Sequence, residues 1–313
     1  MTTPLDPTSA APSAPADRRY RSETGCAAMA LQRGDSLMAT APPADRWLLI
    51  ESRTPWPPQA LTALPHVGPE VARRCADLGY RPVLIRRHGR ADQAVVRRYA
   101  LVDCRPGHES IRWGEFDADA DLVTVLKAVA AGNLTDLQPP TQEPIYLVCT
   151  HGRHDACCAV RGRPVAAALT AAYPDRTWEC SHIGGDRFAG NVVVLPQALF
   201  YGQVTPDRAL EVAKHHAEGR VVPDLLRGAG TFPPPVQAAQ HYARQAGHSL
   251  DLTALRPTQI HPLPNHHYKV TLTHVVVELS IHFDTLDARL TCAGKSPTQV
   301  RRFELHSIEP VEG

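Results

Sequence analysis

The order of apolar runs and helical patterns between residues 145 and 219 constrains the fold more than any other feature of this sequence. Two strand-like runs, IYLVC and RTWECSH, flank an alanine-rich helical stretch, RPVAAALTAAYP. The runs NVVVLP and LFYGQV then follow with the spacing of a hairpin, and TPDRALEVAKHHAEG carries helix signals at both ends. This order predicts a mixed sheet beside helices, with polar loops after the strands, where α/β proteins keep their sites.

The segment before residue 134 predicts a further α/β layer. Four short apolar runs suit strands, namely RWLLIES, RPVLIRR, RRYALVDC and SIRWGEF, and helical patterns cover 69–80 and 119–133. A polar, proline-bearing stretch at 134–144 looks like a linker. After another helix, PPVQAAQHYARQAGH, the runs HYKVTLTHVVVELSIHF, LDARLTC and RRFELHSIEP alternate apolar and polar residues, which predicts a small antiparallel sheet.

These patterns predict four parts of the chain. Residues 1–20 are expected to form a flexible tail, because they are rich in Pro, Ala, Ser and Thr and lack apolar periodicity. An α/β N-terminal region (21–140), a second α/β unit (141–250) and a C-terminal β extension (251–313) follow.

The composition gives few indications of a partner. With 33 basic against 32 acidic residues, no overall field draws the chain to nucleic acid or to a membrane surface. No apolar run approaches the roughly 20 residues of a membrane helix, and the first residues lack the apolar stretch of a secretory signal. The sequence therefore predicts a cytoplasmic protein without a nucleic-acid or membrane partner, and it leaves the oligomeric state open.

The residues that carry chemistry lie in two short stretches, CTHGRHDACC (149–158) and CSHIGGDRFAG (180–190). Eight cysteines are too few for a disulfide scaffold, so their clustering favours metal or redox chemistry. A loop of eight residues between Cys149 and Cys158 could bring both sulfurs to one metal centre, and the glycines between His182 and Asp186 permit a sharp turn. From the residues alone, an iron-sulfur cluster, a zinc ion and thiol chemistry all stay open.

Several neighbours of these residues have both a functional and an ordinary interpretation. Cys157 suits a packed thiol or a redox partner of Cys158, and His151 and His154 suit solvated loop residues or groups that tune a metal site. The arginines beside the two stretches could steer an acidic partner or serve as surface charges; they are Arg153, Arg161, Arg163 and Arg187.

Three stretches of the chain, CTHGRHDACCAVRGRPVAAAL, WECSHIGGDRFAGNVVVLP and FYGQVTPDRALEV, resemble the sucrase/ferredoxin-like family. The resemblance runs from about Cys26 to about His248. It implies a thioredoxin-like ferredoxin domain over 141–250 that carries a [2Fe-2S] cluster. It also implies that two cysteines separated by eight residues, here Cys149 and Cys158, bind one iron, and that a His-x-Gly-Gly-His motif binds the other.

This chain departs from that motif, because His182 occupies its first histidine position and Asp186 its second. We predict a cofactor site of Cys149, Cys158, His182 and Asp186, with a lower reduction potential than a bis-histidine site because a carboxylate favours ferric iron. An alternative leaves Asp186 as a structural cap and completes the site with Cys180, Cys157 or His154.

The predicted function is electron transfer between a donor and an acceptor protein that the sequence does not identify. No catalytic residues are predicted, because the chain lacks nucleotide-binding motifs and shows no pair of carboxylates suited to sugar hydrolysis. The alternatives are a thioredoxin-like thiol oxidoreductase and a non-redox zinc-binding protein.

Overall fold

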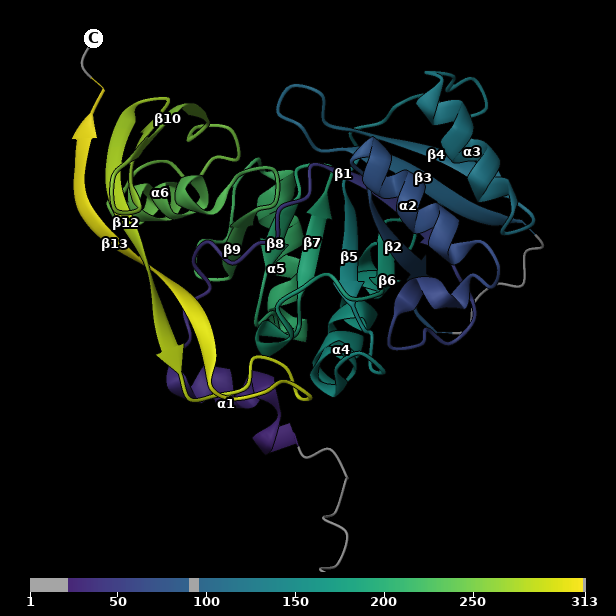
Figure 1. Cartoon of the computed structure of the whole chain (residues 1–313), viewed down its shortest axis with the longest axis horizontal. Coiled ribbons are helices and arrows are strands. Elements are labelled where there is room, and N and C mark those ends of the chain that lie inside the picture. Colours follow the sequence, from purple (N-terminus) through teal and green to yellow (C-terminus); the bar gives the residue numbers. More distant parts are fainter. Residues whose placement is uncertain (1–21, 90–95, 312–313) are drawn as a thin grey trace, which may run out of the picture.

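A computed structural model describes residues 22–89 and 96–311, and its largest element is a nine-stranded mixed sheet with the strand order β4-β3-β1-β2-β6-β5-β7-β8-β9 (Figure 1). The predicted flexible tail, residues 1–20, lies outside the described residues. The strands of this sheet are β1 (Arg46–Glu51), β2 (Arg81–Arg86), β3 (Arg97–Asp103), β4 (Ser110–Phe116), β5 (Ile145–Cys149), β6 (Thr177–Cys180), β7 (Val192–Leu195), β8 (Leu199–Tyr201) and β9 (Leu226–Ala229).

Two parallel strand pairs form the centre of the sheet. Strand β1 runs parallel to β2, and β5 runs parallel to β6. A short antiparallel ladder between β2 and β6, at Ile85 and Cys180 and at Arg86 and Glu179, joins the two pairs. Strands from before and after residue 140 thus share one sheet, and the division of the chain into the four predicted parts stays a prediction.

Six α-helices pack around the strands among the described residues: α1 (Cys26–Arg33), α2 (Gly68–Leu78), α3 (Asp121–Ala130), α4 (Ala156–Ala172), α5 (Pro206–Ala217) and α6 (Pro234–Gln245). Side chains of β5 alternate between two cores, as the two-residue period of a strand requires. Tyr146 and Val148 pack with Val165 and Leu169 of α4, whereas Leu147 and Cys149 belong to a core on the opposite face. That second core also contains the cysteines of α4, so it borders the polar loops.

A separate four-stranded antiparallel sheet contains β10 (Pro257–Leu263), β11 (His267–Leu272), β12 (Val275–Leu286) and β13 (Thr298–Pro310). It packs on α6 through a core that includes Val236, Val270 and Val277. Figure 1 shows β12 and β13 continuing as a long ribbon that reaches α1. The predicted fold class, α/β with a mixed sheet and a small antiparallel β extension after it, is therefore confirmed, and the strands of the N-terminal α/β region belong to that same mixed sheet.

Two expectations about local structure are wrong. Helix α4 begins at Ala156 rather than near residue 163, because Asp155 caps it by accepting a hydrogen bond from the Cys157 backbone N–H, and Pro164 lies inside the helix. The run LDARLTC is not a strand, since β12 ends at Leu286 and residues 287–297 form the loop to β13. Among the described residues, no helix is long and apolar enough to cross a membrane.

Candidate metal centre

The two polar loops meet at the carboxyl ends of β5 and β6. Cys149 and Cys180 are register partners on these parallel strands, so the loops that follow them leave the same edge of the sheet side by side. The loop after β5 leads into α4, whose first turn places Cys158 beside Cys149 at the end of β5. A Cβ atom at Gly162 would collide with the carbonyl oxygen of Cys149, so only glycine at this position lets α4 approach the strand so closely.

The structure places the four predicted ligands in one continuous group. Cys158 Sγ lies 3.2 Å from Oδ1 of Asp186, and the same oxygen lies 2.9 Å from Nδ1 of His182. Cys149 shares a hydrogen bond with Cys158 on the other side. Three of these side chains are buried, whereas that of His182 is 29% exposed. The group therefore joins a pair of thiols to a pair of harder donors.

The thiols of this group do not ionise equally. Hydrogen bonds from Cys158 and Cys180, together with the nearby His182, lower the pKa of Cys149 well below its ordinary value. The same interaction with Cys149 raises the pKa of Cys158, and burial raises the pKa of Cys180. Cys149 is thus the thiol of the three that loses its proton most readily, and the deprotonated form is the one that binds a metal.

His182 lies beside Asp186 and is electrostatically coupled to it. Burial is the largest single effect on its pKa and lowers it, but the carboxylate of Asp186 and the thiolate of Cys149 outweigh burial and raise the pKa overall. Its Nδ1 is buried and, despite its closeness to Asp186, has no partner with hydrogen-bond geometry among the described residues. The 2.9 Å approach of Nδ1 to Asp186 Oδ1 is therefore an electrostatic contact, which a metal between the two atoms would replace as His182 loses its proton.

The turn between His182 and Asp186 depends on its two glycines. Gly184 and Gly185 have φ angles of 95° and 85°, which favour glycine. A Cβ at Gly185 would also collide with the guanidinium of Arg227. Asp186 begins the short 3-10 helix η3 (Asp186–Phe188), but its carboxylate does not cap that helix and points to Cys158 and His182 instead.

Arg227, on β9, holds this turn in place by a hydrogen bond to the Gly184 carbonyl oxygen, and it is not among the residues predicted from the sequence. Its fully buried guanidinium donates to the carbonyl oxygens of Gly184 and Thr40, at 2.9 and 2.6 Å, and to side-chain oxygens of Asn191 and Thr40. Burial lowers its pKa to about 9. The only sequence feature that points to it is a single charge in an otherwise apolar strand, LRGA.

We expect Arg227→Met to lower the free energy of unfolding by about 3 kcal/mol or more, because it leaves several buried oxygens without donors. Urea denaturation monitored by circular dichroism measures this. The matched control is Arg220→Met at an exposed position, which should change the free energy by less than about 0.5 kcal/mol. Equal stability of the two variants would contradict the supporting role of Arg227.

The neighbouring histidines have different environments. His151 is buried and uses both ring nitrogens: Nε2 lies 2.8 Å from the Pro57 carbonyl oxygen, and Nδ1 accepts the backbone N–H of His182 at 3.2 Å. It therefore braces the His182 backbone. The ring of His154 stacks on that of His182 at 3.7 Å, and its side chain is 33% exposed. His154 Nε2 lies 3.6 Å from Oδ2 of Asp186, so His154 borders the group without being buried in it.

The remaining candidates from the sequence fall into three environments. The thiol of Cys180 adjoins Cys149, whereas Cys157 belongs to another group of side chains around Asp155. Arg187 pairs with Asp35 at 3.4 Å. Arg153 and Arg163 are exposed, and Arg161 is half-buried.

These donors fit a [2Fe-2S] cluster by their chemistry. The two sulfur donors suit one iron, and imidazole and carboxylate suit a second iron, as imidazole does in Rieske centres. The contacts of Cys158 with Cys149 and with Asp186, and of Asp186 with His182, place two soft and two harder donors side by side; metal binding would displace the protons of the thiols and of His182. The same donor set also meets the coordination rules of zinc.

Known proteins match this chain over parts of its length. Altered inheritance of mitochondria protein 32 from Meyerozyma guilliermondii is 30% identical over 97 residues, which cover 28% of this chain and 34% of the relative. The Candida glabrata protein of that name is 28% identical over 96 residues, covering 26% of this chain and 31% of the relative. This chain thus spans about a third of the length of these curated relatives.

Among solved structures, a thioredoxin-like [2Fe-2S] ferredoxin from Aquifex aeolicus matches with 24% identity and a TM-score of 0.25, over 29% of this chain and 94% of that chain. The family model described as sucrase/ferredoxin-like matches residues 37–228. This match covers more than half of the chain and includes all four predicted ligands. The chain belongs to the sucrase/ferredoxin-like family.

Proposed function

We propose that this protein is a one-electron carrier whose [2Fe-2S] cluster is held by Cys149, Cys158, His182 and Asp186. The observation that carries the proposal is the 3.2 Å contact between Cys158 Sγ and Asp186 Oδ1. It joins the buried thiol pair to the imidazole and carboxylate pair, although the two pairs come from different loops. A cluster at this place would supply a reversible one-electron couple.

The buried and the exposed residues of the site would have different roles: the buried cysteines would shield the cluster from solvent, and the exposed histidines would contact the redox partner. Cys149 and Cys158 are at most 1% exposed, so they keep solvent from the sulfur side. His182 is the exposed donor of the four, and the partly exposed ring of His154 stacks on it. Electrons would therefore enter and leave through the edge formed by His182 and His154.

Electron transfer requires a donor and an acceptor protein, each changing by one electron, so that the carrier returns to its starting state. Arg153 is exposed in the same loop as His154, and Arg163 is exposed on the first half of α4. The exposed cation of Arg153, in the same loop as His154, favours partners with acidic surfaces, because redox encounters are small and guided by charge.

The test is metal analysis and spectroscopy of full-length protein purified without oxygen. We expect a red-brown protein with about two irons and two acid-labile sulfides per chain and a paramagnetic signal after chemical reduction. Protein that lacks iron after anaerobic purification and reduces disulfides would favour the thiol oxidoreductase. Colourless protein with zinc bound through Cys149 and Cys158 would favour the non-redox zinc protein. Either result would contradict the proposal.

A further inference from the structure

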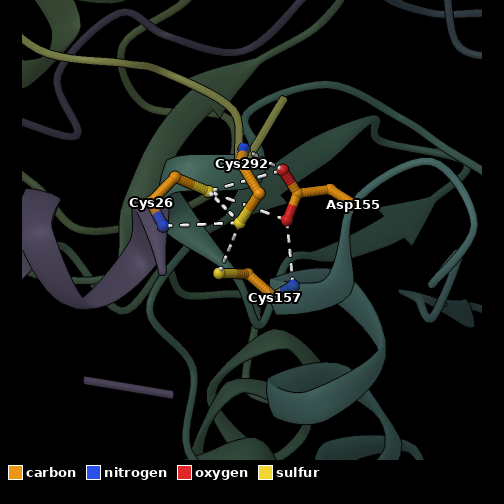
Figure 2. A group of neighbouring side chains, drawn as sticks. All are labelled: Cys26, Asp155, Cys157 and Cys292. Atoms are coloured by element: carbon orange, nitrogen blue, oxygen red, sulfur yellow. Dashed lines mark hydrogen bonds between the residues drawn. The ribbon is translucent and has the colours of Figure 1, made fainter. Parts of the chain in front are cut away.

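A second group of metal-binding side chains lies beside the candidate centre and shares none of its residues. It contains Cys26, Asp155, Cys157 and Cys292, whose potential ligand atoms all lie within 4.8 Å of one another. Figure 2 shows the three sulfur atoms and the carboxylate pointing toward one another. The residues come from distant parts of the chain: the start of α1, the start of α4 and the loop between β12 and β13. These residues are too far apart in the sequence to form a recognisable metal-binding motif.

The distances within the group match those of a tetrahedral zinc site. Cys292 Sγ lies 3.5 Å from Cys157 Sγ and 3.7 Å from Cys26 Sγ, and Cys26 Sγ lies 3.5 Å from Oδ2 of Asp155. Zinc bonds of about 2.3 Å to sulfur and about 2.1 Å to oxygen, at tetrahedral angles, place two sulfurs about 3.8 Å apart and a sulfur and an oxygen about 3.6 Å apart. The side chains are thus spaced for a common ion.

The charge and hydrogen bonds of the group also favour a cation. Asp155 is 2% exposed, and no basic side chain among the described residues forms an ion pair with it. Its carboxylate accepts the backbone N–H groups of Cys157 and Cys292, at 2.9 and 2.6 Å. A buried carboxylate without a counter-charge is costly, and a divalent ion would remove that cost.

Two backbone N–H groups at the start of α1 point at the sulfurs. The N–H of Cys26 donates to Cys292 Sγ, and that of Ala27 donates to Cys157 Sγ, both at 3.5 Å. Such donors stabilise a thiolate more than a thiol, and the positive end of a helix dipole adds to the effect.

We propose that Cys26, Asp155, Cys157 and Cys292 bind one structural zinc ion that fastens the C-terminal β extension and α1 to the start of α4. Three sulfur donors and one carboxylate oxygen form a complete set for zinc, with no open position for a substrate. The thiols lose their protons to solvent as the ion binds. Cys292 is the partly exposed member, and its loop gives the ion a way in.

The zinc site gives a physical reason for the adjacent cysteines of α4. Cys157 and Cys158 are both fully buried, yet Cys157 faces Cys292 while Cys158 faces Asp186. One turn of helix would therefore anchor the structural ion on one side and the redox centre on the other. The proposal does not depend on the proposed electron transfer.

The test measures metals in the full-length protein and in single variants. We expect about one zinc per chain, and a fall of about tenfold or more in Cys292→Ser with the iron content unchanged. The matched control, Cys75→Ser, changes a buried thiol of α2 outside both groups and should keep the zinc. Equal zinc in Cys292→Ser and wild type, or loss of iron instead of zinc, would overturn the proposal.

A second measurement does not rely on the folding of a variant. Cobalt added to metal-stripped wild-type protein should give the intense visible bands of a tetrahedral cobalt-thiolate site and protect Cys26 and Cys292 from alkylation, as read by mass spectrometry. Because cobalt can also bind Cys149 and Cys158, the protection of Cys26 and Cys292 is the deciding readout. Absence of those bands, unprotected thiols, or a disulfide among the three cysteines of the anaerobic protein would overturn it. The alkylation of Cys26 and Cys292 does not depend on bound iron. The zinc site and the electron-transfer function can therefore be disproved independently of each other.

Discussion

Cys158→Ala is expected to abolish the visible absorption of the protein and to reduce its bound iron to less than about a tenth of the wild-type content. Cys158 is the residue at which the two donor pairs meet, since it contacts both Cys149 and Asp186. Alanine has no donor atom, so it cannot replace the sulfur on a cluster iron. Iron analysis and the absorption spectrum of anaerobically purified protein measure the loss.

The neighbouring residue provides the control. Cys157 is as deeply buried as Cys158 and lies in the same turn of α4, but its sulfur faces Cys292. Cys157→Ala should therefore keep the iron and the spectrum and lose zinc. If both variants kept a wild-type spectrum, the assignment of Cys158 to the cluster would be wrong. If Cys180→Ser alone lost it, the third thiol beside Cys149 would be the ligand.

Much of the main sheet could be predicted from the sequence because its strands are short apolar runs bounded by proline, glycine and charged residues. The runs at 46–51, 81–86, 97–103 and 110–116 all form strands, and the predicted hairpin of β7 and β8 is confirmed. The order of β5, α4, β6, β7, β8 and α5 is also confirmed. Each of these helices and strands could be predicted because its apolar pattern and end signals lie within its own stretch of sequence.

The elements that could not be predicted depend on distant contacts. Residues 287–292 have the alternation of a strand, but they form a loop in which the Cys292 backbone N–H bonds to Asp155, 137 positions away in the sequence. The start of α4 was placed too late because Pro164 is typical of a first helical turn, whereas the cap is Asp155. The ladder between β2 and β6 likewise has no local pattern.

The same distinction holds for the two groups of ligands. Cys149 and Cys158, and His182 and Asp186, lie within short loops, so spacing could single them out, and their convergence follows from the parallel pairing of β5 and β6. Arg227 and the group around Asp155 come from separate parts of the chain. Only the packing of α1 and the β12–β13 loop against α4 brings Cys26 within reach of Cys292.

Asp186→His, which restores the His-x-Gly-Gly-His pattern, should keep the cluster and raise its reduction potential. The carboxylate of Asp186 is 2% exposed and touches both Cys158 and His182, so its negative charge is poorly screened and stabilises the oxidised, more positive state. Replacing it by a neutral imidazole is expected to shift the potential upward by about 100 mV, which corresponds to about 2.3 kcal/mol for one electron.

A redox titration monitored by visible absorption measures that shift. Two further variants test whether the shift comes from ligand exchange at Asp186. Asp186→Ala should destabilise the cluster or change its spectrum, because it removes a ligand without a substitute. Asp77→Ala, which removes one negative charge from the exposed face of α2, should leave the potential within about 20 mV because solvent screens an exposed charge. An Asp186→Ala protein with the wild-type spectrum and potential would show that Asp186 is not a ligand, and His154, which stacks on His182, would then be the nearest imidazole to test.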